Sequence, residues 1–69
     1  MTNTYYVKER AENLKLGDLF VDWAVAPVYG EGHRILNIKN KGEYLKVYLD
    51  DTRQFNLHPK HAVVIEVLA

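Results

Sequence analysis

Residues 44–57 read YLKVYLDDTRQFNL and contain two alternating stretches separated by a turn. Apolar side chains occupy every second position from Leu45 to Leu49, which is typical of a β-strand that packs one face on a core. The Asp-Asp-Thr sequence at 50–52 favours a tight turn. Alternation then resumes and continues to Leu57. These residues predict a β-hairpin and an all-β fold class.

The segment before this hairpin predicts a third strand. Residues 34–39 (RILNIK) are rich in β-branched and aliphatic residues and alternate in part. Asn40 and Gly42 follow, and both residue types accept the positive φ angles of a hairpin turn. We therefore expect a three-stranded meander over residues 34–57.

Two further strands flank this meander. Residues 19–23 (LFVDW) predict a strand, and a long connection over 24–33 links it to the meander. Pro59 interrupts the pattern at 58–61, where we expect a single 3₁₀ turn. The last strand, 62–68, has apolar residues on both faces. Its outer face needs cover, either from Tyr5 and Val7 or from a second copy of the chain, so a homodimer through the last strand is possible.

Sixty-nine residues are enough for one domain, which we place at 1–69 with residues 1–13 as an N-terminal extension or edge segment. Residues 4–7 predict an edge strand, and the spacing of Val7, Ala11 and Leu14 predicts one helical turn. The chain has no cysteine, which excludes disulfides and favours a reducing compartment. We find no signal peptide and no apolar run of membrane-spanning length, and we expect a cytoplasmic protein that does not bind membranes.

The expected order of strands and connections resembles an SH3-like barrel, with five strands, a long first loop and a 3₁₀ turn before the last strand. Gly17-Asp18 before apolar residues, and Gly32 followed by Ile35 and Ile38, resemble the KOW and Tudor-like group, although Ile35 lies one position later than that pattern has it. In size and rhythm the chain resembles small barrel proteins encoded by phages and plasmids. The resemblance implies a closed barrel that binds a partner.

The common catalytic motifs are absent, so we expect no enzymatic activity, no catalytic residue and no cofactor. The chain has neither cysteine nor serine, and its glycines do not form a phosphate-binding loop. His33, His58 and His61 are the best candidates for a metal site, but their spacing does not ensure the geometry that zinc needs, and we expect no bound metal. Asp50 and Asp51 are expected to cap turn amides.

Aromatic residues are the best candidates for contact with a protein partner. Trp23 and Tyr29 bracket the long loop, and Tyr44, Lys46 and Tyr48 share the face of their strand that points away from the core. Rings with a cation between them suit a peptide, but Tyr44 and Tyr48 could equally pack under the N-terminal segment, and Trp23 could close the core.

A nucleic-acid-binding module is the alternative function. Tyr44, Lys46 and Tyr48 would then form a patch with Arg34, Lys39 and Arg53 on nucleic acid within a transcription or translation complex. The nine basic and nine acidic residues cancel, however, and this balance favours a small regulatory protein that binds a protein. The resemblance to small barrel proteins implies a phage or mobile-element origin. A third alternative is an oligomeric enzyme with a shared pore, as in type II dihydrofolate reductases, whose active-site strand motif is absent.

Overall fold

The computed structural model describes residues 3–22, 24–25 and 28–68, with side chains described outside residues 23–29. They form one antiparallel sheet of six strands: β1 (Thr4–Arg10), β2 (Leu19–Val21), β5 (Gly32–Asn40), β6 (Leu45–Leu49), β7 (Gln54–Leu57) and β8 (Ala62–Leu68). A separate two-stranded sheet of β3 (Ala24–Val25) and β4 (Val28–Tyr29) lies within the expected long loop. The predicted all-β class is confirmed.

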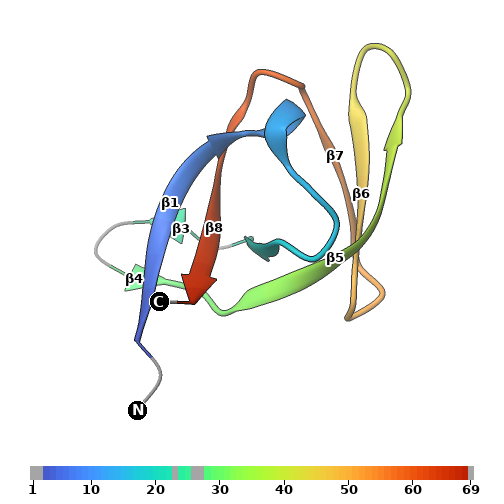
Figure 1. Ribbon diagram of the computed structural model, residues 1–69. Coiled ribbons are helices and arrows are strands. Elements are labelled where there is room, and N and C mark those ends of the chain that lie inside the picture. The colour runs from blue at the N-terminus through green and yellow to red at the C-terminus, as the bar shows by residue number, and fades with distance from the viewer. Residues whose placement is uncertain (1–2, 23, 26–27, 69) are drawn as a thin grey trace.

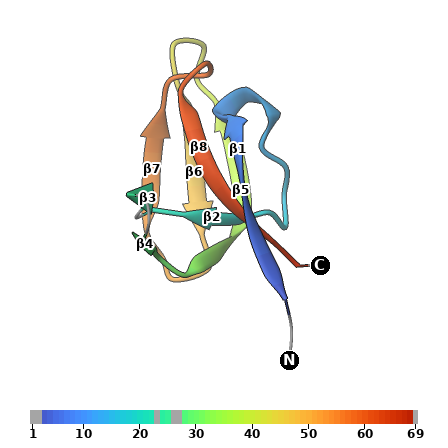
Figure 2. The same cartoon turned by 90° about the vertical axis from the view of Figure 1, so that its left-hand side faces the viewer.

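The strand order in the main sheet is β1-β8-β2-β5-β6-β7, and the sheet curls around its core (Figures 1 and 2). Five barrel strands were expected, with an edge strand at residues 4–7 in addition. This edge strand is β1, which runs on to Arg10 and pairs with β8 along its whole length, from Thr4 opposite Leu68 to Arg10 opposite Ala62. Among the described residues, β1 and β7 do not pair with each other. The sheet is therefore open, unlike the closed barrel that the sequence led us to expect.

The N-terminal segment is a strand followed by a short 3₁₀ helix, η1 (Ala11–Asn13). The prediction of a helical turn is wrong for residues 7–10, because this segment pairs with β8 throughout. Ala11 and Leu14 nevertheless point into the core, as their spacing suggested. In the described part of the chain, no helix has the length and apolar character to cross a membrane.

The turn at residues 58–61 is fastened to η1. The His61 amide donates to the His58 carbonyl at 2.9 Å, which makes the single turn expected around Pro59. The Ala11 amide donates to the His61 carbonyl at 2.9 Å, and the Glu12 amide donates to the Pro59 carbonyl at 2.8 Å. These bonds hold the N-terminal segment against the connection between β7 and β8.

The hairpin between β5 and β6 has the chemistry predicted for it. Gly42 has a φ of +88°, and its amide donates to Asn40 Oδ1 at 2.8 Å. Within β5, Ile35 is opposite Leu49 whereas Asn37 is opposite Tyr48, so the ladder contains a bulge. The extra residue shifts the alternation of side chains between the two faces of the strand by one position. Ile35 and Ile38 therefore both reach the core, although they are three residues apart.

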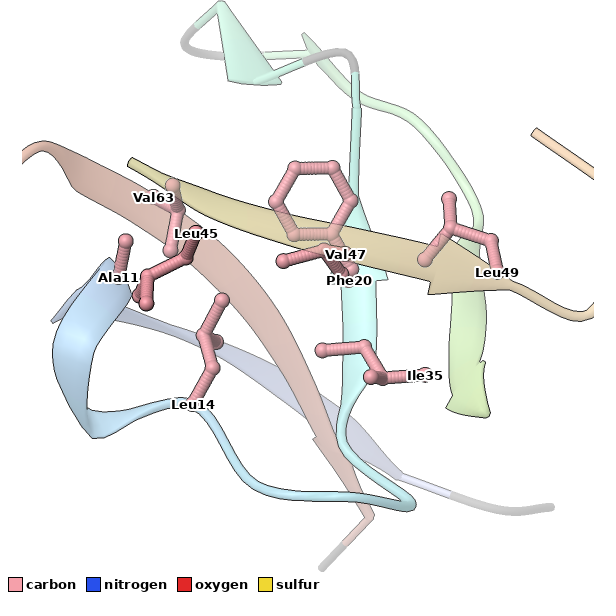
Figure 3. Close-up of a cluster of buried hydrophobic side chains, with 8 residues drawn as sticks. All are labelled: Ala11, Leu14, Phe20, Ile35, Leu45, Val47, Leu49 and Val63. Atoms are coloured by element: carbon pink, nitrogen blue, oxygen red, sulfur yellow. The ribbon is translucent and has the colours of Figure 1, made fainter. Parts of the chain in front are cut away.

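A core of eight buried hydrophobic side chains fills the space inside the curled sheet (Figure 3). Three of them alternate along β6, as the sequence predicted. The cluster consists of Ala11, Leu14, Phe20, Ile35, Leu45, Val47, Leu49 and Val63.

The last strand is flanked on both edges. β1 pairs with all of β8 on one side, and β2 pairs with its Val64–Glu66 stretch on the other. Tyr5 and Val7 lie beside β8 in the sheet, opposite Val67 and Ile65, so they extend its face and do not cover it. A homodimer through this strand would have to use its face, where Leu68 is 61% exposed.

Close packing fixes the junction of β2, β5 and β8 at Gly32. A Cβ atom at this position would lie 2.8 Å from Leu19 Cβ and 2.9 Å from Glu66 Oε1. The Gly32 amide also donates to Glu66 Oε1 at 3.3 Å. Glycine is therefore required here by the approach of two neighbouring strands.

Thr52 is the strained position of the hairpin between β6 and β7. Its φ is 71°, its amide donates to the Leu49 carbonyl at 3.2 Å, and the Leu49 amide donates to the Arg53 carbonyl at 2.9 Å. This is a three-residue loop that ends in a left-handed residue, a position that favours glycine and disfavours β-branched side chains.

We predict that Thr52→Gly raises the free energy of unfolding by about 0.5–1 kcal/mol, because relief of the left-handed strain outweighs the added entropy of the unfolded chain. Urea denaturation followed by circular dichroism measures the change. Thr52→Ala is the matched control, since it removes the branched side chain but keeps a Cβ at positive φ. Equal stabilisation by the two substitutions would contradict this account.

Candidate functional site

A groove of about 430 Å³ lies where the sheet fails to close. Its described walls come from β7 on one side and from β8 on the other, with β2 and one residue of β1 completing it. Figure 2 shows β7 and β8 diverging from the turn that joins them, with β2 running across the space. The lining residues are Lys8, Phe20, Val21, Asp22, Phe55, Leu57, His61, Ala62, Val63 and Val64.

The walls of the groove are mainly apolar. Phe20 and Phe55 are in contact, with ring centroids 5.3 Å apart and ring planes tilted by 40°. Phe20 and Val63 are buried core residues, whereas Phe55 and Leu57 are half-buried. The groove thus exposes the side of the hydrophobic core that none of the described strands covers, and its volume lies in the range of sites that bind a ligand.

The charged residues at the groove differ in whether a residue of opposite charge pairs with them. The Arg53 guanidinium pairs with the Asp22 carboxylate, and its Nε donates to Asp51 Oδ2 at 2.6 Å. Lys8 forms no ion pair with any described residue, and His61 is exposed. Within the described part of the chain, the groove therefore has a neutralised acidic end and an unpaired cation.

Asp51 and Arg53 stabilise each other's charged forms. Partial desolvation raises the pKa of Asp51, but hydrogen bonds from the Arg53 amide and guanidinium, together with the charges of Arg53 and His33, outweigh it and hold the pKa below its ordinary value. Hydrogen bonds to Asp22 and then to Asp51 raise the pKa of Arg53. Arg53, which the sequence assigned to the alternative nucleic-acid patch, thus takes part in an ion-pair network with Asp22 and Asp51.

His33 lies apart from His58 and His61, so the three histidines do not form one site. His33 Nδ1 lies 3.5 Å from Asp50 Oδ1 and 3.6 Å from Asp51 Oδ2, just before β7 begins. His58 and His61 lie beyond the other end of this four-residue strand, which spans roughly 13 Å. His58 Nδ1 accepts the Lys60 amide at 3.1 Å, so His58 caps its turn.

His33, Asp50 and Asp51 place one ligand atom each within 4.8 Å of one another, a grouping that the sequence analysis missed. Arg53 already bonds Asp51, and the Asp50 Oδ2 atom accepts the Arg34 amide at 3.3 Å. The two carboxylates are therefore already bound to positive charges and amides within the protein.

A second surface lies on the outer face of β5 and β6. Lys39 is opposite Lys46 in the ladder, and their Nζ atoms lie 5.4 and 5.7 Å from the centroid of the Tyr48 ring. The structure therefore joins Lys39, which the sequence assigned to the alternative patch, with Lys46 and Tyr48. We call these three residues the Tyr48 cluster.

The remaining candidate residues lie elsewhere or are not described. Trp23 is outside the described residues, and Tyr29 is described as part of β4 without its side chain. Tyr44 precedes β6 and is 37% exposed, and its carbonyl accepts the Lys41 amide. Arg34 is exposed on β5 and bonds the adjacent turn through its backbone.

Sequence reasoning missed the groove because it assigned the groove residues to the core. Phe55 and Leu57 were placed correctly on the inward face of their strand. Their incomplete burial follows from the open side of the sheet, which the alternation within one strand does not predict. Pro59 was the available signal for this open side, since it marks the point where the chain leaves β7 without pairing back on it.

The chain matches no known protein family, no curated protein and no solved structure.

We predict that the Asp51–Arg53 pair makes the protein sensitive to acid. A folded-state pKa below the ordinary value gives stability that is present at neutral pH and is lost as the pH falls below about 4 through the folded pKa. Asp51→Asn should therefore be less stable than the wild type at pH 7, and the difference should shrink as the pH falls below about 4 and Asp51 becomes protonated. Urea denaturation across this pH range measures both curves.

Glu43→Gln is the control for the acid prediction, because Glu43 is exposed and forms no ion pair with any described residue. This variant should follow the wild-type curve. A constant stability difference between Asp51→Asn and the wild type at every pH would contradict the proposed role of the pair.

Proposed function

We propose that the protein is a non-enzymatic binding module that holds a segment of a partner protein in the groove between β7 and β8. The observation that supports this proposal is the apolar groove of about 430 Å³, which opens directly onto the core through Phe20, Phe55 and Leu57. A concave apolar site with a few polar groups is the usual form of a binding site.

The charge of the chain also favours a protein partner. Basic and acidic residues are equal in number, and Arg53 and Arg10 are paired with Asp22, Asp51 and Glu12. Affinity for nucleic acid depends mainly on cations that are free to neutralise phosphates. Binding in an apolar groove has no such requirement.

We also propose that β2 and β5–β8 form an open SH3-like barrel to which β1 is added. The order of connections supports this assignment, since a long connection separates β2 from β5, tight turns follow β5 and β6, and the turn with Pro59 precedes β8. In this assignment the groove is the unclosed side of the barrel.

Nucleic-acid binding is kept as a second candidate because of the Tyr48 cluster. Like charges directly opposite each other in a sheet repel, and Lys39 and Lys46 are in this arrangement beside an aromatic ring. A phosphate between the two ammonium groups would relieve the repulsion, and a base could stack on Tyr48.

We predict that Ala62→Tyr abolishes binding in the groove. Ala62 is exposed and lines the groove, so a larger side chain there should fill the space without disturbing the core. Peptides selected on the wild type from a random octapeptide display library should bind this variant at least about tenfold more weakly, by fluorescence anisotropy. Lys60→Tyr is the matched control, since Lys60 is exposed nearby but does not line the groove. Equal affinity for both variants would exclude the groove as the site.

For nucleic acid, we predict that any binding by the wild type is weak and depends on the Tyr48 cluster. A mobility-shift series at increasing salt, with single- and double-stranded probes, compares the wild type with Lys39→Gln/Lys46→Gln. Loss of two phosphate contacts should reduce the slope of log affinity against log salt by about 1.4–1.8. Tight wild-type binding that survives this double substitution would argue against the cluster as the site.

A further inference from the structure

We propose that the outer edge of β7 accepts an extended segment of a partner protein as an additional β-strand, with the inward side chains of that segment entering the groove. This inference rests on the proposed function and specifies how the groove is occupied. It is carried by the backbone of β7, which bonds to β6 on one side and to no described residue on the other.

The pairing with β6 identifies the backbone groups that point outward. The Leu49 amide donates to the Arg53 carbonyl, so residues 49 and 53 form a hydrogen-bonded pair of the antiparallel ladder. Such pairs alternate with pairs that are not hydrogen-bonded. Opposite positions in this ladder are Phe55 with Val47 and Leu57 with Leu45, so these two residues of β7 bond to β6. Gln54 and Asn56 therefore direct their N–H and C=O groups to the outer edge.

The groove is located where the next strand of the sheet would lie. Strands in a sheet are about 4.8 Å apart, and residues opposite each other share a face. A segment added to β7 would place its inward side chains beside Phe55 and Leu57, which form one wall of the groove. Val63 and Val64 of β8 would contact the same side chains from the opposite wall.

The two ends of the sheet differ in their protection against added strands. β1 ends in Lys8, Glu9 and Arg10, and charged residues on an edge oppose pairing with another chain. β7 consists of Gln-Phe-Asn-Leu and contains neither a charge nor a proline. Its edge is short, which suits a specific contact of a few residues, and it lies beside exposed apolar surface.

The groove also indicates the chemistry of the segment. Apolar residues at alternate positions would face Phe55 and Leu57, with polar residues between them. Lys8 is an unpaired cation among the described residues at the groove, whereas Asp22 is neutralised by Arg53. Charge complementarity therefore favours a carboxylate beside the apolar residues. We assign the edge to an extended, alternating apolar segment with an acidic flank.

The test uses peptides selected on the wild-type protein from the random octapeptide display library. Asn56→Pro removes the outward N–H of β7 while leaving the pairing with β6 intact, since Asn56 does not bond to β6. We expect this substitution to weaken peptide binding about five- to tenfold, as expected for one lost hydrogen bond. Asn56→Thr is the matched control, which keeps the N–H and should bind like the wild type.

The outcomes separate this inference from the proposed function. Peptides that lose affinity for Ala62→Tyr but bind Asn56→Pro normally would overturn strand addition and leave the groove as the site. Peptides that bind both variants normally would overturn both. A wild-type dimer that Asn56→Pro converts to a monomer in sedimentation would assign the edge to a second copy of the chain and overturn the assignment to a partner.

A second measurement applies if Asn56→Pro does not fold. The selected peptide is synthesised with one N-methyl group at each amide in turn. Strand addition uses amides on one edge of the peptide, so methylation should weaken binding at every second position and be tolerated between them. Uniform sensitivity, or none, would overturn the inference.

Discussion

The close approach of β2 to β5 and β8 is the constraint on which the sheet depends. β2 has three residues, and through them the ladder passes from the β1–β8 pair to the β5–β6–β7 meander. Gly32 permits this approach, because a Cβ atom there would collide with Leu19 and with Glu66. Phe20 at the centre of β2 can then face Ile65 across the ladder and join the core.

The open side of the sheet follows from how β7 and β8 are connected. Consecutive antiparallel strands usually pair through a tight hairpin, but here the chain turns at Pro59 and the turn is bonded to η1 instead. β8 then pairs with β1 and β2, so β7 is left with β6 alone among the described strands. The groove is therefore a consequence of topology, and the half-burial of Phe55 and Leu57 reflects the missing neighbour.

Local signals in the sequence predicted local structure. Alternation identified β6 and β7, and Gly42 identified the turn before them, because side-chain period and φ preference act within a few residues. The pairing of β1 with β8, the bulge in β5 and the bond from Arg53 to Asp22 depend on residues far apart in the chain. Such contacts are set by the assembled sheet, which is why the helical turn was predicted in place of a longer strand.

The same distinction explains why the candidate site moved from exposed aromatic residues to the groove. Sequence reasoning seeks chemistry in exposed rings and cations, and it treats inward-facing apolar residues as core. In this fold the two categories overlap, since Phe55 is inward-facing and also borders an open groove. Arg53 shows the opposite case, because the sequence suggested a basic residue free to bind a partner, whereas its guanidinium pairs with Asp22 and Asp51. The Arg53 Cζ atom also lies 5.7 Å from the centroid of the Phe55 ring. This ion-pair network connects the residues before β7 to Asp22, which lines the groove.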